Sequence, residues 1–226
     1  MEQALLQILK KVEVHPVLDS HLQSEDYISI DLSAQNKGLQ KLDVSSSAQL
    51  QDYIWTYLKK NNAKVAFGGY MEKRGIYQRS QHFNRNDTIT ERNIHLGVDL
   101  WLEAGQPLYA PLDGTLHSFK NNINFGDYGP TLILQHRLNQ FNFYTLYGHL
   151  SLSSLNGKEL GAFFKKGQCI ATLGTPKENG DYPPHLHFQI IIDLQDNFGD
   201  YPGVCSSREV DYYRENCPDP NLLLRL

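Results

Sequence analysis

The sequence has few cysteines, no long apolar run and no excess of basic charge, and each absence excludes a class of protein. Its 226 residues contain three cysteines, which is too few for a disulfide framework and leaves at least one thiol unpaired within the monomer. No segment reaches the roughly 20 apolar residues that a membrane-spanning helix needs. The net charge of −4 supplies no electrostatic attraction for nucleic acid. We therefore expect no membrane span and no nucleic-acid partner.

The N-terminus also lacks the features of a signal peptide. It has an acidic residue at position 2, and Gln7 interrupts its apolar stretch, whereas a signal peptide has a basic start and a continuous apolar region. We expect a cytoplasmic protein on this ground, or a periplasmic or extracellular one if a leader is missing from the chain. The oligomeric state stays open.

The three cysteines have different surroundings in the sequence. Cys169 lies in an apolar, strand-like run and is predicted to be a small core residue. Cys205 and Cys217 could pair across a C-terminal loop or remain free thiols, and the sequence leaves both alternatives open.

The first sixty-odd residues have a different pattern from the rest. A short helix is expected over residues 3–12, a strand over residues 26–33, and a helix over about residues 48–60 that one of the serines at 45–47 caps. We predict a small α/β extension over residues 1–66, with no catalytic residues of its own.

From residue 65 onward, short apolar runs alternate with turn signals rich in glycine, asparagine and aspartate. The runs predict strands over residues 107–110, 114–119, 131–136, 141–147, 168–173 and 186–192. Short strands at regular intervals favour an antiparallel core over βαβ units. We predict a mainly β fold, an antiparallel sheet and barrel-sandwich hybrid, with a main domain over residues 67–200 and a C-terminal tail over 201–226 that packs on it.

Two pairs of polar residues are compatible with strands that carry metal ligands. Side chains alternate along a strand, so His95, Gly97 and Asp99 are expected on one face, and His185 and His187 share a face in the same way. Two imidazoles and a carboxylate from two such strands are the ligand types of a catalytic zinc site, which keeps its fourth position for water. Hydrolysis is therefore the first functional hypothesis.

Three ordered motifs carry a family resemblance. His95-x-x-x-Asp99, Tyr147-Gly-His149-Leu and His185-x-His187 resemble those of the M23 zinc metallopeptidases, the lysostaphin/LytM type of peptidoglycan endopeptidase. The intervening segments 109–115 and 166–174 resemble strand-turn signatures of the same family, and the likeness covers roughly residues 67–195.

The resemblance implies a division of roles among five residues. His95, Asp99 and His187 would hold one Zn²⁺ per chain, and His149 and His185 would be the catalytic histidines. One of these two histidines would take a proton from water and the other would stabilise the oxyanion, and the sequence does not decide which does which. The predicted activity is that of a metalloendopeptidase (EC 3.4.24) that hydrolyses peptide bonds in peptidoglycan cross-bridges or stem peptides. Narrow specificity is expected from a groove that admits only small side chains near the metal.

Other interpretations stay open. The strand-turn segments also resemble barrel-sandwich carrier domains, although a phosphohistidine carrier has no use for the carboxylate of Asp99. The chain could instead be a catalytically silent, metal-binding interaction domain. A further hypothesis is that the extension covers the groove, so that removal of residues 1 to about 64 raises hydrolysis.

Histidines outside the motifs are expected to be structural or solvated: His15, His21, His82, His117 and His136. Of these, His136 is expected at a strand end near the site. Tyr147 could orient His149, contact substrate or pack in the core.

Overall fold

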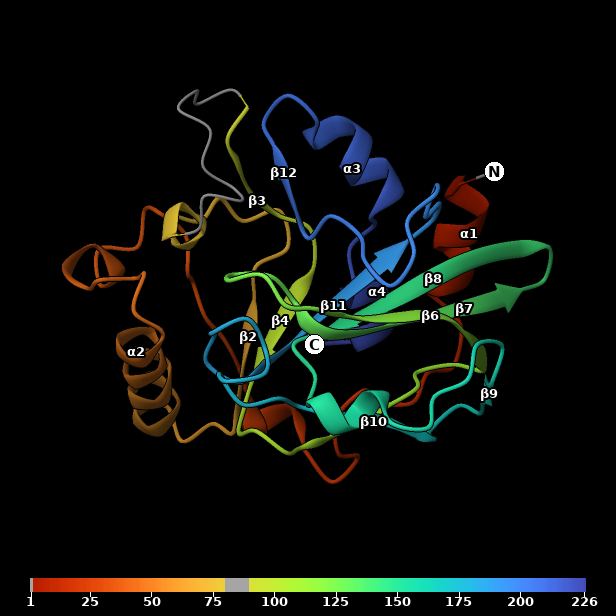
Figure 1. The fold of residues 1–226 in the computed structure, drawn as a ribbon, viewed down its shortest axis with the longest axis horizontal. Coiled ribbons are helices and arrows are strands. Elements are labelled where there is room, and N and C mark those ends of the chain that lie inside the picture. The colour runs from red at the N-terminus through yellow and green to blue at the C-terminus, as the bar shows by residue number, and fades with distance from the viewer. Residues whose placement is uncertain (1, 80–89) are drawn as a thin grey trace.

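A computed structural model describes residues 2–79 and 90–226, and one large sheet forms its centre (Figure 1). The sheet has the order β1-β2-β4-β11-β8-β7-β6-β9. All neighbouring strands in it are antiparallel except the parallel pair β1 and β2. The strands are β1 (Tyr27–Ser29), β2 (Val65–Gly68), β4 (Val98–Trp101), β11 (His185–Ile191), β8 (Phe141–Gly148), β7 (Gly129–Leu138), β6 (Gly114–Asn122) and β9 (Phe163–Phe164). The predicted fold class, mainly β with an antiparallel sheet, is confirmed.

Two short ladders complete the β structure. β3 (Arg92–His95) pairs with β12 (Val204–Ser206), and β5 (Pro107–Tyr109) pairs with β10 (Cys169–Thr172). All six strands predicted between residues 107 and 192 are present, with ends that differ by up to three residues.

The helices lie outside the sheet: α1 (Glu2–Leu9), α2 (Ser47–Lys60), α3 (Val210–Asn216) and α4 (Asn221–Leu224). Among the described residues, no helix is both long and apolar enough to cross a bilayer. Figure 1 shows α1 and α2 on opposite sides of the molecule. The hydroxyl of Ser46 caps α2 by accepting a hydrogen bond from the N–H of Gln49, as the serine run predicted. The strand expected over residues 26–33 is shorter, because the Asp31 carboxylate accepts from the N–H of Ser33 and begins a turn.

The extension joins the sheet and the core. Leu5 and Leu9 of α1 belong to the main apolar cluster, which covers one face of the sheet with Leu134, Tyr147 and Phe188. β1 extends the sheet through β2, which pairs with β4. The sheet is therefore continuous across residue 66, and the domain boundary there stays a prediction.

The cysteines differ in part from expectation. The prediction for Cys169 is wrong, because this thiol is exposed. β10 pairs only with β5, so that Cys169 faces solvent while Ile170 packs into the core. Cys205 and Cys217 are buried free thiols in the second apolar cluster, and burial raises the pKa of each to about 12.

His136 was predicted near the site, but it does not line the cavity described below and lies on the other face of the sheet. It follows Leu132 and Leu134 on one side of β7, and these leucines pack with Phe188, whereas His187 points to the opposite side of β11. Its two ring nitrogens bond the Asp113 carbonyl at 2.8 Å and the Thr145 hydroxyl at 2.7 Å. His136 is thus a satisfied core histidine.

Tyr147 packs in the core, the last of its three predicted alternatives. Its ring meets Phe188 edge-on, and its hydroxyl accepts a hydrogen bond from Thr145 at 3.0 Å. His15, His21 and His117 do not line the cavity described below, and His82 lies outside the described residues.

Candidate metal centre

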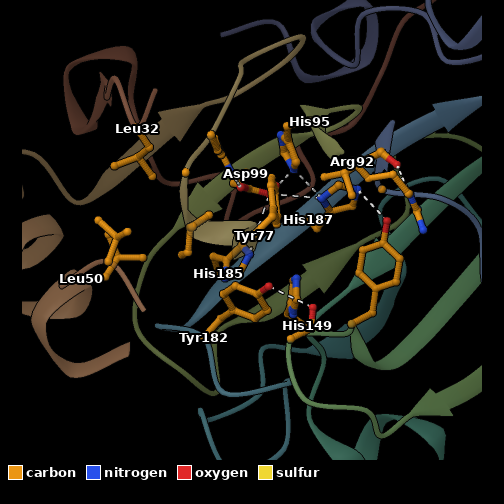
Figure 2. Close-up of a pocket in the computed structure, with 18 of the residues that line it drawn as sticks. Leu32, Leu50, Tyr77, Arg92, His95, Asp99, His149, Tyr182, His185 and His187 are labelled. Atoms are coloured by element: carbon orange, nitrogen blue, oxygen red, sulfur yellow. Dashed lines mark hydrogen bonds and ion pairs between the residues drawn. The ribbon is translucent and has the colours of Figure 1, made fainter. Parts of the chain in front are cut away.

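Three of the predicted site residues converge at the centre of the molecule. His95 ends β3, Asp99 lies in β4, and His187 lies opposite Asp99 in β11. Oδ1 of Asp99 is 3.3 Å from Nε2 of His95 and 3.3 Å from Nδ1 of His187, and these two nitrogens are 2.9 Å apart. Figure 2 shows the three side chains pointing at one another. All three are buried, and their ligand atoms lie within 4.8 Å of one another.

His95 and Asp99 were predicted to share one face of a continuous strand. The structure places them on two different strands. β3 and β4 belong to different sheets, and the chain passes between them at Leu96 and Gly97. A Cβ at Gly97 would lie 2.6 Å from Cε1 of His187 and 2.7 Å from the Phe188 carbonyl oxygen. The backbone therefore changes sheets in direct contact with β11, which only glycine allows.

The outer nitrogens of both histidines are held by oxygen acceptors. Nδ1 of His95 is 3.0 Å from the Gly69 carbonyl, and Nε2 of His187 is 2.9 Å from Oε1 of Gln189. Each imidazole can thus donate its N–H outward and direct its other nitrogen at Asp99, which is how metal-ligating histidines are oriented. Within the described residues, Oδ1 of Asp99 is buried without a hydrogen-bond donor. A buried acceptor between two unprotonated imidazole nitrogens fits a divalent zinc ion.

The other oxygen of Asp99 accepts a hydrogen bond from Arg74. Nη1 of Arg74 is 2.5 Å from Oδ2, and Nε of Arg74 is 2.6 Å from Oε2 of Glu72. Burial by itself raises the pKa of Asp99, but the electrostatic interactions with the His95 ring and with the charged Arg74 outweigh it and hold that pKa well below its usual range. Asp99 is therefore ionised, as a metal ligand must be.

His149 and His185 lie beside this group, with ring centroids 4.1 Å apart. Nδ1 of each ring is 2.8 Å from a backbone carbonyl, that of Asn179 for His149 and that of Pro183 for His185. Nε2 of His185 lies 3.8 Å from Oδ1 of Asp99. Burial lowers the pKa of His185 to about 4. Burial and the neighbouring ring of His185 both lower the pKa of His149 well below its usual value. Both rings are neutral at pH 7, and each has an Nε2 that can accept a proton.

The backbone at His149 holds an uncommon conformation. Its φ is +62°, in the left-handed region that non-glycine residues seldom occupy. Hydrogen bonds fix it on both sides, from the His149 N–H to the Tyr128 carbonyl and from the Gly174 N–H to the His149 carbonyl. The structure thus holds this imidazole in place at the cost of local strain.

Aromatic rings surround the five residues. Trp101 stacks on His185 at 3.9 Å between centroids, Tyr128 lies 5.0 Å from His187, and Tyr182 lies 5.0 Å from His149. These rings were not among the predicted site residues. Trp101 carried a usable signal, because a residue two positions after Asp99 on a strand faces the same side. Arg74 and Glu72 had none, since they lie in a segment without a periodic pattern.

All five predicted residues line one cavity of about 400 Å³. Three of them are within ligand distance of one another and the other two adjoin them, while the role of each stays a prediction. Residues 93–197 match Peptidase family M23. The predicted resemblance to this family is confirmed over these residues.

The similar proteins match about half of this chain. An uncharacterized metalloprotease of Haemophilus influenzae is 36% identical over 112 residues, which are 49% of this chain and 21% of that protein. This chain therefore spans about a fifth of its relative's length.

Solved structures give the same partial coverage. A zinc-containing peptidase from Vibrio cholerae has 29% identity and a TM-score of 0.35, covering 48% of this chain and 30% of its own. The catalytic domain of lysostaphin from Staphylococcus simulans has 22% identity and a TM-score of 0.37, covering 54% of this chain and 80% of its own. At such TM-scores the likeness carries no argument about function.

Proposed function

We propose that this chain is a zinc-dependent endopeptidase (EC 3.4.24) that holds one Zn²⁺ with His95, Asp99 and His187. The observation that carries the proposal is the buried Oδ1 of Asp99, which lacks a hydrogen-bond donor among the described residues and lies 3.3 Å from a nitrogen of each histidine. Membership of residues 93–197 in a peptidase family supports it. Zinc bound at this position would polarise the scissile carbonyl and lower the pKa of a bound water to about 7.

The protein's own part in the reaction is assigned to His149 and His185. Their Nδ1 atoms face backbone carbonyls, so that each neutral ring presents Nε2 to the cavity as a proton acceptor. Burial keeps both rings neutral at pH 7, and one can take a proton from water during attack. The other is proposed to stabilise the negative charge that develops on the substrate, and its Nε2 must first take a proton from solvent to donate a hydrogen bond there.

For the substrate we propose peptide bonds of peptidoglycan cross-bridges or stem peptides. The support is the resemblance of the three motifs to those of lysostaphin-type endopeptidases. The carrier alternative gains no support, because a phosphohistidine carrier needs no carboxylate beside its histidines, and here Asp99 lies between them and Arg74.

The proposal is tested by incubating purified protein with muropeptides and with pentaglycine, with and without a chelator. We expect about one zinc per chain, cleavage that the chelator abolishes, and loss of cleavage in His185→Ala. Protein that binds zinc and is stable but cleaves neither substrate would support a silent binding domain instead. Stoichiometric phosphorylation of His149 or His185 would support a carrier.

A further inference from the structure

The cavity at the metal centre continues into the N-terminal extension. One end is lined by the five site residues, and the other end by apolar side chains. The segment before the family match contributes Leu32, Leu39, Leu42, Val44, Leu50 and Ile76 to this apolar lining, and these six residues are called the wall. All of these precede residues 93–197, which match the family, so this wall belongs to the part of the chain outside that match. Figure 2 shows Leu32 and Leu50 across the pocket from His149 and His187, with His185 between.

A packed core supports the apolar wall. Leu32, Leu39 and Leu50 belong to one buried cluster with Ile54 of α2 and with Trp101 of β4. Trp101 is the residue that stacks on His185 at 3.9 Å. The apolar region therefore begins at a candidate catalytic histidine and is contiguous with the metal centre.

Hydrogen bonds attach the wall to the rest of the protein. The Leu32 N–H donates to Oε1 of Glu72 at 3.0 Å, and the Ala34 N–H donates to the Lys73 carbonyl at 2.9 Å. On the other side, the Ser47 hydroxyl donates to Oδ1 of Asp181 at 2.9 Å. These contacts hold the wall at a fixed distance from the centre.

Residues of the extension line the cavity but do not fill it. The described group that could hold a metal consists of residues from β3, β4 and β11 alone. A volume of about 400 Å³ lies between it and the wall, which is within the size range of ligand pockets.

We propose that Leu42, Val44 and their apolar neighbours form a substrate subsite, which takes an alkyl or aromatic side chain next to the scissile peptide bond. This inference rests on the proposed function, because it gives the substrate class of the same site. A peptide with leucine or phenylalanine at this position would bury that side chain against the wall, whereas a glycine peptide leaves the wall in contact with water. We expect about a 10- to 100-fold higher kcat/KM for the apolar peptide.

This inference differs from the hypothesis that the extension is a removable cover. The extension supplies Leu5, Leu9 and Val65 to the main core and β1 to the sheet, so that its deletion removes part of the folded structure. The full chain is therefore the material for the test.

The test compares zinc-loaded wild type with Val44→Asp, on pentaglycine and on the same peptide with leucine or phenylalanine at each position in turn. Val44 is only half-buried, which makes the variant compatible with folding. The matched control is Val210→Asp, a half-buried valine at the start of α3 outside the cavity lining. We expect the ratio of kcat/KM for the best apolar peptide to that for pentaglycine to fall at least tenfold in Val44→Asp and to stay at the wild-type value in Val210→Asp.

Several outcomes decide the matter. A wild type that prefers pentaglycine, or a ratio unchanged in Val44→Asp, overturns the subsite and leaves the proposed function standing. If neither these peptides nor muropeptides are cleaved, the proposed function fails, and calorimetry of the leucine peptide with both proteins then tests the subsite. If wild type and Val44→Asp then bind the leucine peptide with equal affinity, the subsite is overturned. Tenfold weaker binding of this peptide to the variant supports an apolar binding site without catalysis.

Discussion

Arg74 and Asp99 form a buried ion pair in which one carboxylate oxygen of Asp99 binds Arg74 and the other faces the two histidines. Nη1 of Arg74 donates to Oδ2 at 2.5 Å, while Oδ1 faces His95 and His187 at 3.3 Å. The guanidinium is 4% exposed, and Glu72 holds its Nε. Arg74 thus fixes which oxygen is directed at the histidines.

The first prediction concerns Arg74→Met, which removes the charge and the donor but keeps much of the apolar stem. Oδ2 of Asp99 would then be buried without a partner, and the carboxylate could rotate. We expect zinc affinity to fall by about 10- to 100-fold. Arg74→Lys, which keeps the charge but not the fork geometry, should recover part of the loss.

Zinc affinity is measured by competition with a chelator, and the visible spectrum of the cobalt-substituted protein reports changes in ligand geometry. Arg214→Met is the control, since Arg214 is exposed and pairs with Asp211 at the surface. If Arg74→Met folds and binds zinc with wild-type affinity and an unchanged cobalt spectrum, Arg74 has no positioning role.

The second prediction separates the two histidines of β11. His187→Ala removes one of the three converging ligand atoms and should lose zinc. His185→Ala leaves the group of His95, Asp99 and His187 intact and should keep about one zinc per chain while losing turnover. Metal content after dialysis and hydrolysis of the same samples give the two readouts. Loss of zinc in both variants would place His185 among the ligands.

The third prediction tests the close contact between the backbone at Gly97 and strand β11. A Cβ there lies 2.6 Å from the His187 ring and 2.7 Å from the Phe188 carbonyl oxygen, and this carbonyl cannot move without shifting β11. We expect Gly97→Ala to lower the free energy of unfolding by about 1–3 kcal/mol and to weaken zinc binding at least tenfold. Gly75→Ala is the control, because a Cβ there meets nothing within 4 Å. Denaturant melts and zinc titrations compare them, and equal behaviour would contradict the expected clash.

The strands and their motif residues could be predicted because their signals are local. Side chains alternate between the two faces of β7, β8 and β11 because of strand geometry, and glycines and asparagines mark the turns between strands. The four histidines and the one carboxylate between residues 95 and 187 were found from short motifs in or beside such strands. The switch of sheets between His95 and Asp99 was missed, since Gly97 fits a continuous strand and a break equally well in sequence.

Contacts between distant segments could not be predicted in the same way. Arg74 reaches Asp99 from a segment without periodicity, and its role depends on how Glu72 and the extension pack. Leu50 looked like an ordinary core position of α2, which it is, yet it also lines the cavity. His136 was misplaced because alternation gives the residues that share a face, and not which face of the sheet carries the site.

The fourth prediction is a pH dependence of stability that His136 causes. Burial lowers the pKa of this histidine to about 4 in the folded protein, whereas an unfolded chain titrates near about 6.5. Between these values the unfolded state binds more protons than the folded state, so the free energy of unfolding falls as the pH falls. The contribution of neutral His136 to the free energy of unfolding is fully present above about pH 6.5, and about 2 kcal/mol of it is lost by pH 5.

His136→Gln cannot take up this proton, so its stability should fall by about 2 kcal/mol less than that of wild type between pH 7 and pH 5. Urea unfolding of metal-free protein in chelator at both pH values measures the difference and removes any effect of zinc release. The absolute stability of the variant at pH 7 does not enter the comparison, because the lost hydrogen bonds to Asp113 and Thr145 weaken it equally at both pH values. If the two proteins lose stability in parallel, His136 is protonated in the folded state more easily than its burial implies.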